Sequence, residues 1–147
     1  EAIKRVSGHR ELVASAYVAL NERHYGIHTG KNKWQVKEEI GEAAFLHMRR
    51  GFNVPIEGGE TLKDVHNRVV PHYEAFIKPH LQASKTVLVV AHGNSLRALV
   101  KYLENITDVD VEELEIGTGE VYFYDIDEYG EIIGKEIRSA NPEKLLV

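Results

Sequence analysis

The sequence has 147 residues, of which 43% are hydrophobic and 28% charged, and its formal net charge is −5. This supports one domain with a single core, and the acidic balance argues against nucleic acid or an anionic membrane as the main partner. There is no cysteine, which excludes disulfides and thiolate chemistry and fits a reducing cytoplasm, and no apolar run reaches membrane-spanning length.

The first part of the chain carries weak local signals. Residues 1–6 have a helical pattern, 7–12 indicate a turn, 13–20 a short strand, and the polar, glycine-punctuated stretch 21–32 a loop. The sequence begins inside a helical pattern, and its one methionine is Met48. We therefore expect this chain to be a piece of a longer polypeptide.

Two helical regions follow. Residues 32–50 have a helical pattern, in one piece or two, that Gly51 ends. After a short loop, Thr61 and Asp64 have the spacing of a capping box. The helix that they open carries apolar residues at helical spacing: Leu62, Val65, Val69, Tyr73, Phe76 and Ile77. Pro71 is expected to kink this helix, and Pro79 to lie near its end.

The last third of the chain predicts strands around one more helix. Residues 86–91, TVLVVA, are apolar and β-branched, as in a strand buried on both faces of a parallel sheet. Ser95 is expected to cap the next helix, which has one apolar stripe: Leu96, Leu99, Val100 and Leu103. Residues 121–137 predict two strands joined by a turn at 127–130.

His92 follows the predicted strand directly, and Gly93 and Asn94 precede the next helix. In an open α/β sheet, ligands bind outside the carboxyl ends of the strands. Glycine lets backbone approach a ligand, and a helix start favours an anion. The pattern indicates a histidine that faces a phosphate or carboxylate. The alternative is a histidine that is hydrogen-bonded within a strand–helix turn.

Other candidates are weaker when each is taken alone. Glu22 would serve as a proton donor or acceptor if burial moved its pKa toward neutral, or else it belongs to a solvated polar loop. Arg49 and Arg50 could bind phosphate or carboxylate in bidentate fashion, or simply complement a helix dipole. Lys33 is a single lysine and means little by itself. The histidines lack metal-ligand spacing, so no metal site is predicted.

Two stretches together carry a resemblance. LNERHYG at Leu20–Gly26 and AHGNSLRALVKYL at Ala91–Leu103 resemble the signatures of the cofactor-dependent phosphoglycerate mutases, in the histidine phosphatase superfamily. The likeness runs from about Ala19 to Arg138. The first motif is specific to mutases, and the second occurs in looser form among phosphatases. The resemblance implies one α/β domain over 1–147, with three α/β/α layers and a mostly parallel sheet.

The resemblance also implies roles for single residues. Glu22 would be the general acid/base, and His92 the second active-site histidine, which stabilises the phosphoryl group during transfer. Gly93 and Asn94 would contact the substrate phosphate. The remaining residues implied to bind substrate are Arg23, His24, Tyr25, Lys33, Arg49 and Arg50.

The implied reaction is the interconversion of 3-phosphoglycerate and 2-phosphoglycerate in glycolysis and gluconeogenesis. Such isomerases work through a phosphohistidine, are primed by 2,3-bisphosphoglycerate and use no metal. The expected partner is a phosphorylated sugar acid, with a second copy or a complementing N-terminal segment as a protein partner. Alternatives are a histidine-type phosphatase, a bisphosphoglycerate mutase, or a non-catalytic chain that binds phosphorylated ligands.

The sequence also departs from the family pattern. The family opens with a strand that ends in Arg-His-Gly, and its histidine accepts the phosphoryl group. No Arg-His-Gly occurs here, and GHRE at Gly8–Glu11 has the wrong order. We therefore expect a sheet without its first strand and no turnover by this chain alone. The loop at 52–60 is short, and Gly117-Thr118-Gly119 stands where the family has Pro-Thr-Gly.

Overall fold

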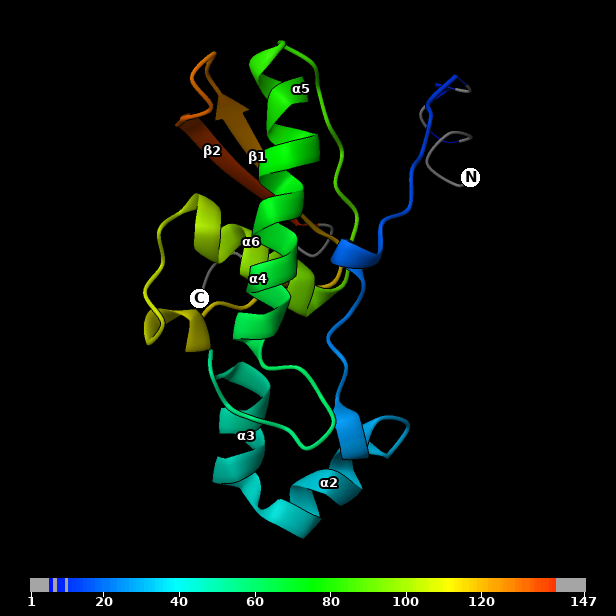
Figure 1. Ribbon diagram of the computed structural model, residues 1–147, viewed down its shortest axis with the longest axis vertical. Helices are drawn as coiled ribbons and strands as arrows, with labels where there is room; N and C mark the ends of the chain where they lie inside the picture. The colour runs from blue at the N-terminus through cyan, green and yellow to red at the C-terminus, as the bar shows by residue number, and fades with distance from the viewer. Residues whose placement is uncertain (1–5, 7, 10, 140–147) are drawn as a thin grey trace.

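The computed structural model describes residues 6, 8–9 and 11–139 (Figure 1). Helices and one hairpin follow each other along the chain. In order, the elements are η1 (Val18–Leu20), η2 (Gly26–His28), α2 (Lys33–Ile40), α3 (Glu42–Arg50), α4 (Leu62–His72), η3 (Tyr73–Ile77), α5 (Lys78–Gln82), α6 (Gly93–Leu103), η4 (Asp110–Glu112), β1 (Glu120–Ile126) and β2 (Ile132–Ser139). No helix among these is long and apolar enough to cross a membrane.

The helical region at 32–50 forms two helices, α2 and α3, which meet at Gly41. This residue has a φ of 85°, a value that favours glycine. The side chain of Asn32 caps α2 by accepting a hydrogen bond from the backbone N–H of Trp34 at 2.9 Å. Gly51 follows the last residue of α3, as predicted.

The helices α4, η3 and α5 form one column (Figure 1). The predicted capping box is present: Thr61 Oγ1 accepts from the Asp64 N–H at 3.0 Å, and Asp64 Oδ2 accepts from the Thr61 N–H at 2.8 Å. Pro71 lies in the last turn of α4, and the π-helical turn η3 follows at once. The helical disturbance expected near this proline therefore takes the form of a wider turn. Pro79 lies in the first turn of α5, close to the end of the column.

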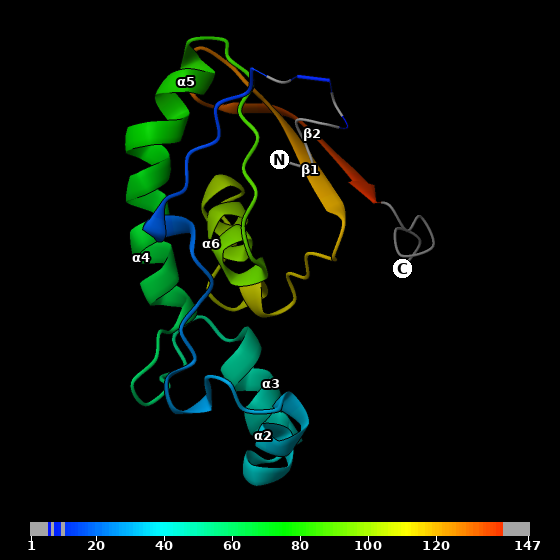
Figure 2. The same cartoon turned by 90° about the vertical axis from the view of Figure 1, so that its right-hand side faces the viewer.

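The core lies where α6 packs against α4. Figure 2 shows α6 between the α4–α5 column and the hairpin. The side chains that are completely buried here come from both helices and from η4: Leu62, Val65, Val69, Ala98 and Val111. Because α6 is apolar on the side that meets α4, packing holds its first turn, which carries the candidate site, in place.

The strands β1 and β2 form an antiparallel hairpin, with Tyr122 opposite Ile137. The turn lies where the sequence predicts it. Asp127 Oδ1 accepts from the N–H groups of Tyr129 and Glu131 at 2.9 and 2.8 Å, and Gly130 has a φ of 85°. The prediction of two strands around this turn is confirmed.

Residues 86–91 differ from the prediction. The segment is extended but pairs with no strand among the described residues, and Leu88 and Val90 are 61% and 69% exposed. The prediction of a strand buried on both faces is wrong for this structure, and so is that of a mostly parallel sheet, because the described sheet is the antiparallel pair β1–β2. A buried parallel strand needs a hydrogen-bonding neighbour. Residues 87–91 instead line a cavity of about 780 Å³ together with α6 and β1.

Two smaller predictions are also wrong. Residues 13–20 form no strand but an exposed extended segment that ends in η1. The N-cap of α6 is His92 rather than Ser95. Ser95 lies inside the helix, where its hydroxyl donates to the carbonyl of Asn21 at 2.6 Å. The helical pattern at 1–6 and the turn predicted at 7–12 fall mostly or partly outside the described residues.

Candidate active site

The carboxylate of Glu22 lies where the loop at 20–26 meets the start of α6. Its Oε1 accepts hydrogen bonds from Asn94 Nδ2 at 2.9 Å and from the Arg23 N–H at 2.7 Å. Its Oε2 lies 3.8 Å from Nδ1 of His92, the N-cap of α6. The imidazole of His92 is 71% exposed, so it is open to an incoming ligand. The structure therefore joins the two stretches that the sequence singles out.

Asn94 connects Glu22 to the rest of the site. It is buried, and its Nδ2 donates a second hydrogen bond, to the Tyr25 hydroxyl at 3.0 Å. Its Oδ1 accepts from Nη1 of Arg97 at 3.2 Å. The amide thus presents its nitrogen to Glu22 and Tyr25 and its oxygen to a cation.

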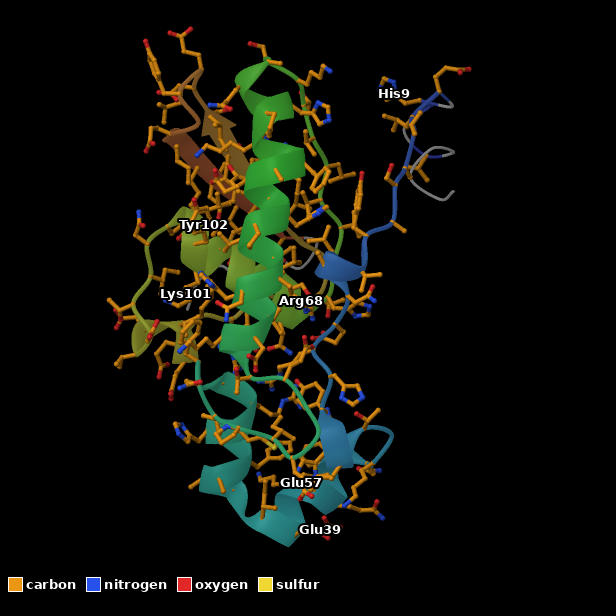
Figure 3. All side chains as sticks on the ribbon, in the orientation of Figure 1. His9, Glu39, Glu57, Arg68, Lys101 and Tyr102 are labelled. Carbon is orange, nitrogen blue, oxygen red and sulfur yellow. The ribbon has the colours of Figure 1, made fainter. Side chains whose placement is uncertain are left out.

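Charged side chains from α4 and its approach loop hold the Glu22 loop in place. Arg68, labelled beside α4 in Figure 3, donates to the carbonyls of Ala19 and Glu22 at 2.6 and 3.3 Å and to the Glu60 carboxylate at 2.8 Å. Glu60 also accepts from the N–H of His24 at 2.9 Å. The hydrogen bond from Arg68 lowers the pKa of Glu60. Sequence reasoning missed this pair, because its partners are backbone groups more than thirty residues away.

A pocket of about 470 Å³ opens beside Glu22 and is rich in cationic groups. Arg23 is 2% exposed, and its guanidinium donates to the carbonyl of Met48 at 3.2 Å. The Nε and Nη1 atoms of Arg23 are buried without a hydrogen-bond partner in the described part of the chain. The pocket is lined by Glu22, Arg23, His24, Tyr25, His28, Thr29, Gly30, Lys31, Lys33, Val36, Phe45, Met48 and Arg49. This excess of N–H donors and positive charge fits an anion with several oxygens.

The structure separates the two arginines of the predicted pair. Arg49 lines the pocket. Arg50 lies outside this lining, donates to the carbonyl of Leu114 at 3.4 Å and forms an ion pair with Glu115 at 3.3 Å. Gly93 has open space where a Cβ would be, and it lines the larger cavity with His92 instead of the cationic pocket.

Arg97 is a buried residue of the site that sequence reasoning missed. It is 6% exposed, and burial together with the charges of Arg50 and Arg23 lowers its pKa to about 10. The signal available in the sequence is its place on α6, a cation among apolar residues three positions after Asn94. Among the described residues, no three or more histidine or acidic side chains are grouped so that they could hold a metal ion.

The fold belongs to a known class of proteins. The family model of the histidine phosphatase superfamily (branch 1) matches residues 1–136, and the chain belongs to that superfamily. A protein of Tropheryma whipplei (strain Twist), named 2,3-bisphosphoglycerate-dependent phosphoglycerate mutase, is 51% identical over 76% of this chain and 58% of its own length. A Corynebacterium diphtheriae protein with the same name is 39% identical over 84% of this chain and 59% of its own length.

The chain thus spans little more than half the length of these relatives. A solved structure of a mycobacterial glucosyl-3-phosphoglycerate phosphatase with inorganic phosphate matches with a TM-score of 0.66 and 22% identity, covering 93% of this chain and 68% of its own. The native structure of that phosphatase matches with a TM-score of 0.61 and 26% identity, over 78% and 56%. The first likeness shows the histidine phosphatase fold.

Proposed function

We propose that this chain provides the substrate pocket and the proton-transfer carboxylate of a 2,3-bisphosphoglycerate-dependent phosphoglycerate mutase. The observation that carries this proposal is the grouping of Glu22, His92 and Asn94 beside a pocket lined by cations. The names of the relatives at 39% to 51% identity support it.

The geometry suits phosphoryl transfer, which depends on positioning and on positive charge around the transferred oxygens. Glu22 would exchange a proton with the substrate hydroxyl, while His92 and the open backbone at Gly93 would face the phosphoryl group. Arg23, Lys33 and Arg49 would neutralise the substrate phosphate and carboxylate. 2,3-Bisphosphoglycerate would supply the phosphoryl group that primes the enzyme. It carries several charged oxygens, and these fit the N–H donors of Arg23 that have no partner among the described residues.

The remaining predicted residues have supporting parts in this proposal. Tyr25 would hold the amide of Asn94, to which its hydroxyl is hydrogen-bonded. The Nδ1 of His24 lies 3.1 Å from the carbonyl oxygen of Gly58 and 3.2 Å from the backbone nitrogen of Gly26, so we assign His24 to shaping the pocket wall. For Arg50 we propose substrate contact only if its ion pair with Glu115 opens.

A phosphatase is the second candidate, because the two solved structures above are described as phosphatases. The two reactions differ in the group that accepts the phosphoryl group: water in a phosphatase, a substrate hydroxyl in a mutase. A bisphosphoglycerate mutase would differ from both by its product.

Binding and turnover test the proposal separately. Titration calorimetry should show that this chain binds 3-phosphoglycerate more tightly than p-nitrophenyl phosphate. A fusion that places the N-terminal segment of the Tropheryma whipplei relative before this chain should convert 3-phosphoglycerate to 2-phosphoglycerate. Hydrolysis of p-nitrophenyl phosphate by the fusion without isomerisation would identify a phosphatase instead.

The 147-residue chain alone provides a further check. Its sequence contains no Arg-His-Gly, so we expect no phosphohistidine after incubation with labelled 2,3-bisphosphoglycerate. A labelled histidine on this chain would contradict the proposed division of roles.

A further inference from the structure

We propose that Arg97 is a positioning residue of this site, which sets the orientation of the Asn94 amide and holds the end of α3 against α6. The inference rests on the proposed function, since it assigns Arg97 to the support of the same site. Arg97 does not line that pocket, so it would act through the groups that it binds.

The first step concerns the side-chain amide of Asn94. A guanidinium can only donate hydrogen bonds and an ionised carboxylate can only accept them. With Arg97 Nη1 at 3.2 Å on one side and Glu22 Oε1 at 2.9 Å on the other, Asn94 satisfies both only when its oxygen faces Arg97. The reversed amide would place N–H against N–H and oxygen against oxygen. Arg97 therefore fixes which atom of Asn94 faces the carboxylate.

The second step concerns the C-terminal end of α3. The last carbonyls of a helix lack helical partners and form the negative end of its dipole. Arg97 donates to the carbonyls of Arg49 and Arg50 at 3.4 and 2.8 Å. Arg23 donates to the carbonyls of Met48 and Arg49 at 3.2 and 3.5 Å. Two buried cations thus hold the backbone from which the Arg49 side chain reaches the pocket.

The third step concerns the loop after α6. Arg97 Nη2 donates to the carbonyl of Val111 at 2.6 Å, and Nε donates to that of Leu114 at 3.0 Å. One side chain therefore joins three segments: the first turn of α6, the end of α3 and residues 111–114. The oxygens that accept these hydrogen bonds are all neutral. The positive charge of Arg97 is therefore not cancelled by a hydrogen-bonded carboxylate, which suits a position beside an anion-binding pocket.

Lys101 offers a matched control on the same helix. It lies about one turn further along α6 and is 8% exposed, against 6% for Arg97. Its Nζ donates to the carbonyl of Ile106 at 2.7 Å and pairs with Asp108 at 2.8 Å. Loss of either cation from α6 should destabilise the fold, but only Arg97 touches a residue of the site.

The first test needs no ligand. In ¹H–¹⁵N spectra of the full 147-residue chain, the side-chain NH₂ signals of Asn94 are identified by their loss in Asn94→Ala. We expect these signals to shift or broaden in Arg97→Met and to stay in place in Lys101→Met. Unmoved Asn94 signals in Arg97→Met would overturn the proposal. Arg97→Lys keeps the charge with fewer donors and serves if Arg97→Met does not fold; it should give a smaller shift.

The second test is a double-mutant cycle on 3-phosphoglycerate affinity. We expect Arg97→Met to weaken the binding of 3-phosphoglycerate about tenfold, the usual effect of losing one hydrogen bond that involves a charged group. Arg97→Lys should recover part of the lost affinity. In an Asn94→Ala background the same change should weaken binding no more than about twofold, because the effect through the Asn94 amide is already lost and only the effect through the end of α3 remains. Equal losses in both backgrounds, or equal losses for Arg97→Met and Lys101→Met, would overturn the proposal. If the unaltered chain does not bind 3-phosphoglycerate, the proposed function fails and the Asn94 spectra alone decide the role of Arg97.

Discussion

Single charged residues outside the Glu22 loop determine how that loop is held. Arg68 reaches from α4 to the carbonyls of Ala19 and Glu22, and Glu60 binds both Arg68 and the backbone of His24. The Arg68 hydrogen bond lowers the pKa of Glu60. Because its folded-state pKa lies below its ordinary value of 4.5, the ionised carboxylate stabilises the fold above that pH and loses this effect as the pH falls.

The first prediction concerns this pH dependence. At neutral pH, Glu60→Gln should lower the free energy of unfolding by about 1 kcal/mol, since the ion pair is partly exposed and screened. The difference from the unaltered chain should shrink as the pH falls from neutrality to below 4.5, the ordinary pKa of this carboxyl, because Glu60 then becomes protonated. Urea titrations across that range measure it. Glu39→Gln is the control. It removes an exposed ion pair with Lys31 and should leave the free energy of unfolding almost unchanged at any pH.

The second prediction concerns proton transfer by Glu22. In the active fusion, Glu22→Gln should lower kcat about 10²- to 10⁴-fold, the usual size of a general acid–base contribution. Affinity for 3-phosphoglycerate should change little, because glutamine still accepts the hydrogen bond from Asn94. Steady-state kinetics and calorimetry separate the two effects. Glu57→Gln, an exposed position outside the pocket lining, is the control, and a kcat loss as large there would refute the role of Glu22.

The contact between η2 and the loop at 56–59 leaves no space for a side chain at position 26. Gly26 has a φ of 53°, and a Cβ there would lie 1.9 Å from the carbonyl oxygen of Glu57. The N–H of Ile27 donates to that same carbonyl at 3.0 Å. Since the clash is with backbone, a side chain at position 26 would push η2 away and displace the adjacent Tyr25.

The third prediction compares two glycines with left-handed backbone. Gly30 has a φ of 78°, but a Cβ there would meet nothing within 4 Å. Gly30→Ala should therefore lower the free energy of unfolding only by the strain of a left-handed backbone, about 1 to 2 kcal/mol. Gly26→Ala should lower the free energy of unfolding by more than this. It should also weaken 3-phosphoglycerate binding, because it displaces Tyr25. Thermal unfolding and calorimetry report the two quantities, and equal effects at both positions would show that the close backbone approach at Gly26 has no consequence.

What the sequence predicts depends on how far apart the interacting residues are. The capping box of Thr61 and Asp64 and the turn at 127–130 involve neighbours a few residues apart, and both are confirmed. The β-branched run at 86–91 indicates an extended segment, but pairing depends on a neighbour elsewhere, and none is found among the described residues. Arg97 escapes prediction because its partners are mostly backbone carbonyls, which any residue supplies.

The whole molecule combines a closed core at one face of α6 with an open cavity at another. The cavity of about 780 Å³ lies among residues 87–91, α6 and β1. Leu88 and Val90 are largely exposed, and the backbone beside them has no strand partner in the described part of the chain. Unpaired extended segments with apolar side chains tend to associate with other strands.

The fourth prediction follows from this open face. The chain should bind the hydrophobic dye ANS, and Leu88→Asp should reduce the fluorescence while leaving the helical circular dichroism unchanged. Ile133→Asp is the control, because Ile133 is 70% exposed on β2 and does not line the cavity. The fusion with an N-terminal segment should bind less dye than the chain alone. Equal loss of fluorescence in both variants would place the dye elsewhere.

The hydrogen bonds from Arg23 and Arg97 to the end of α3 affect which substitutions this helix end can tolerate. Both cations hold this helix end, at residues 48–50, through main-chain oxygens, which are the same whatever side chain is present. We therefore expect substitutions at position 49, which lines the pocket, to alter ligand preference without disturbing the backbone that Arg23 and Arg97 hold. Selection can therefore act separately on these backbone contacts and on the side chain that faces the pocket. We expect related proteins to differ in substrate through residues at this end of α3.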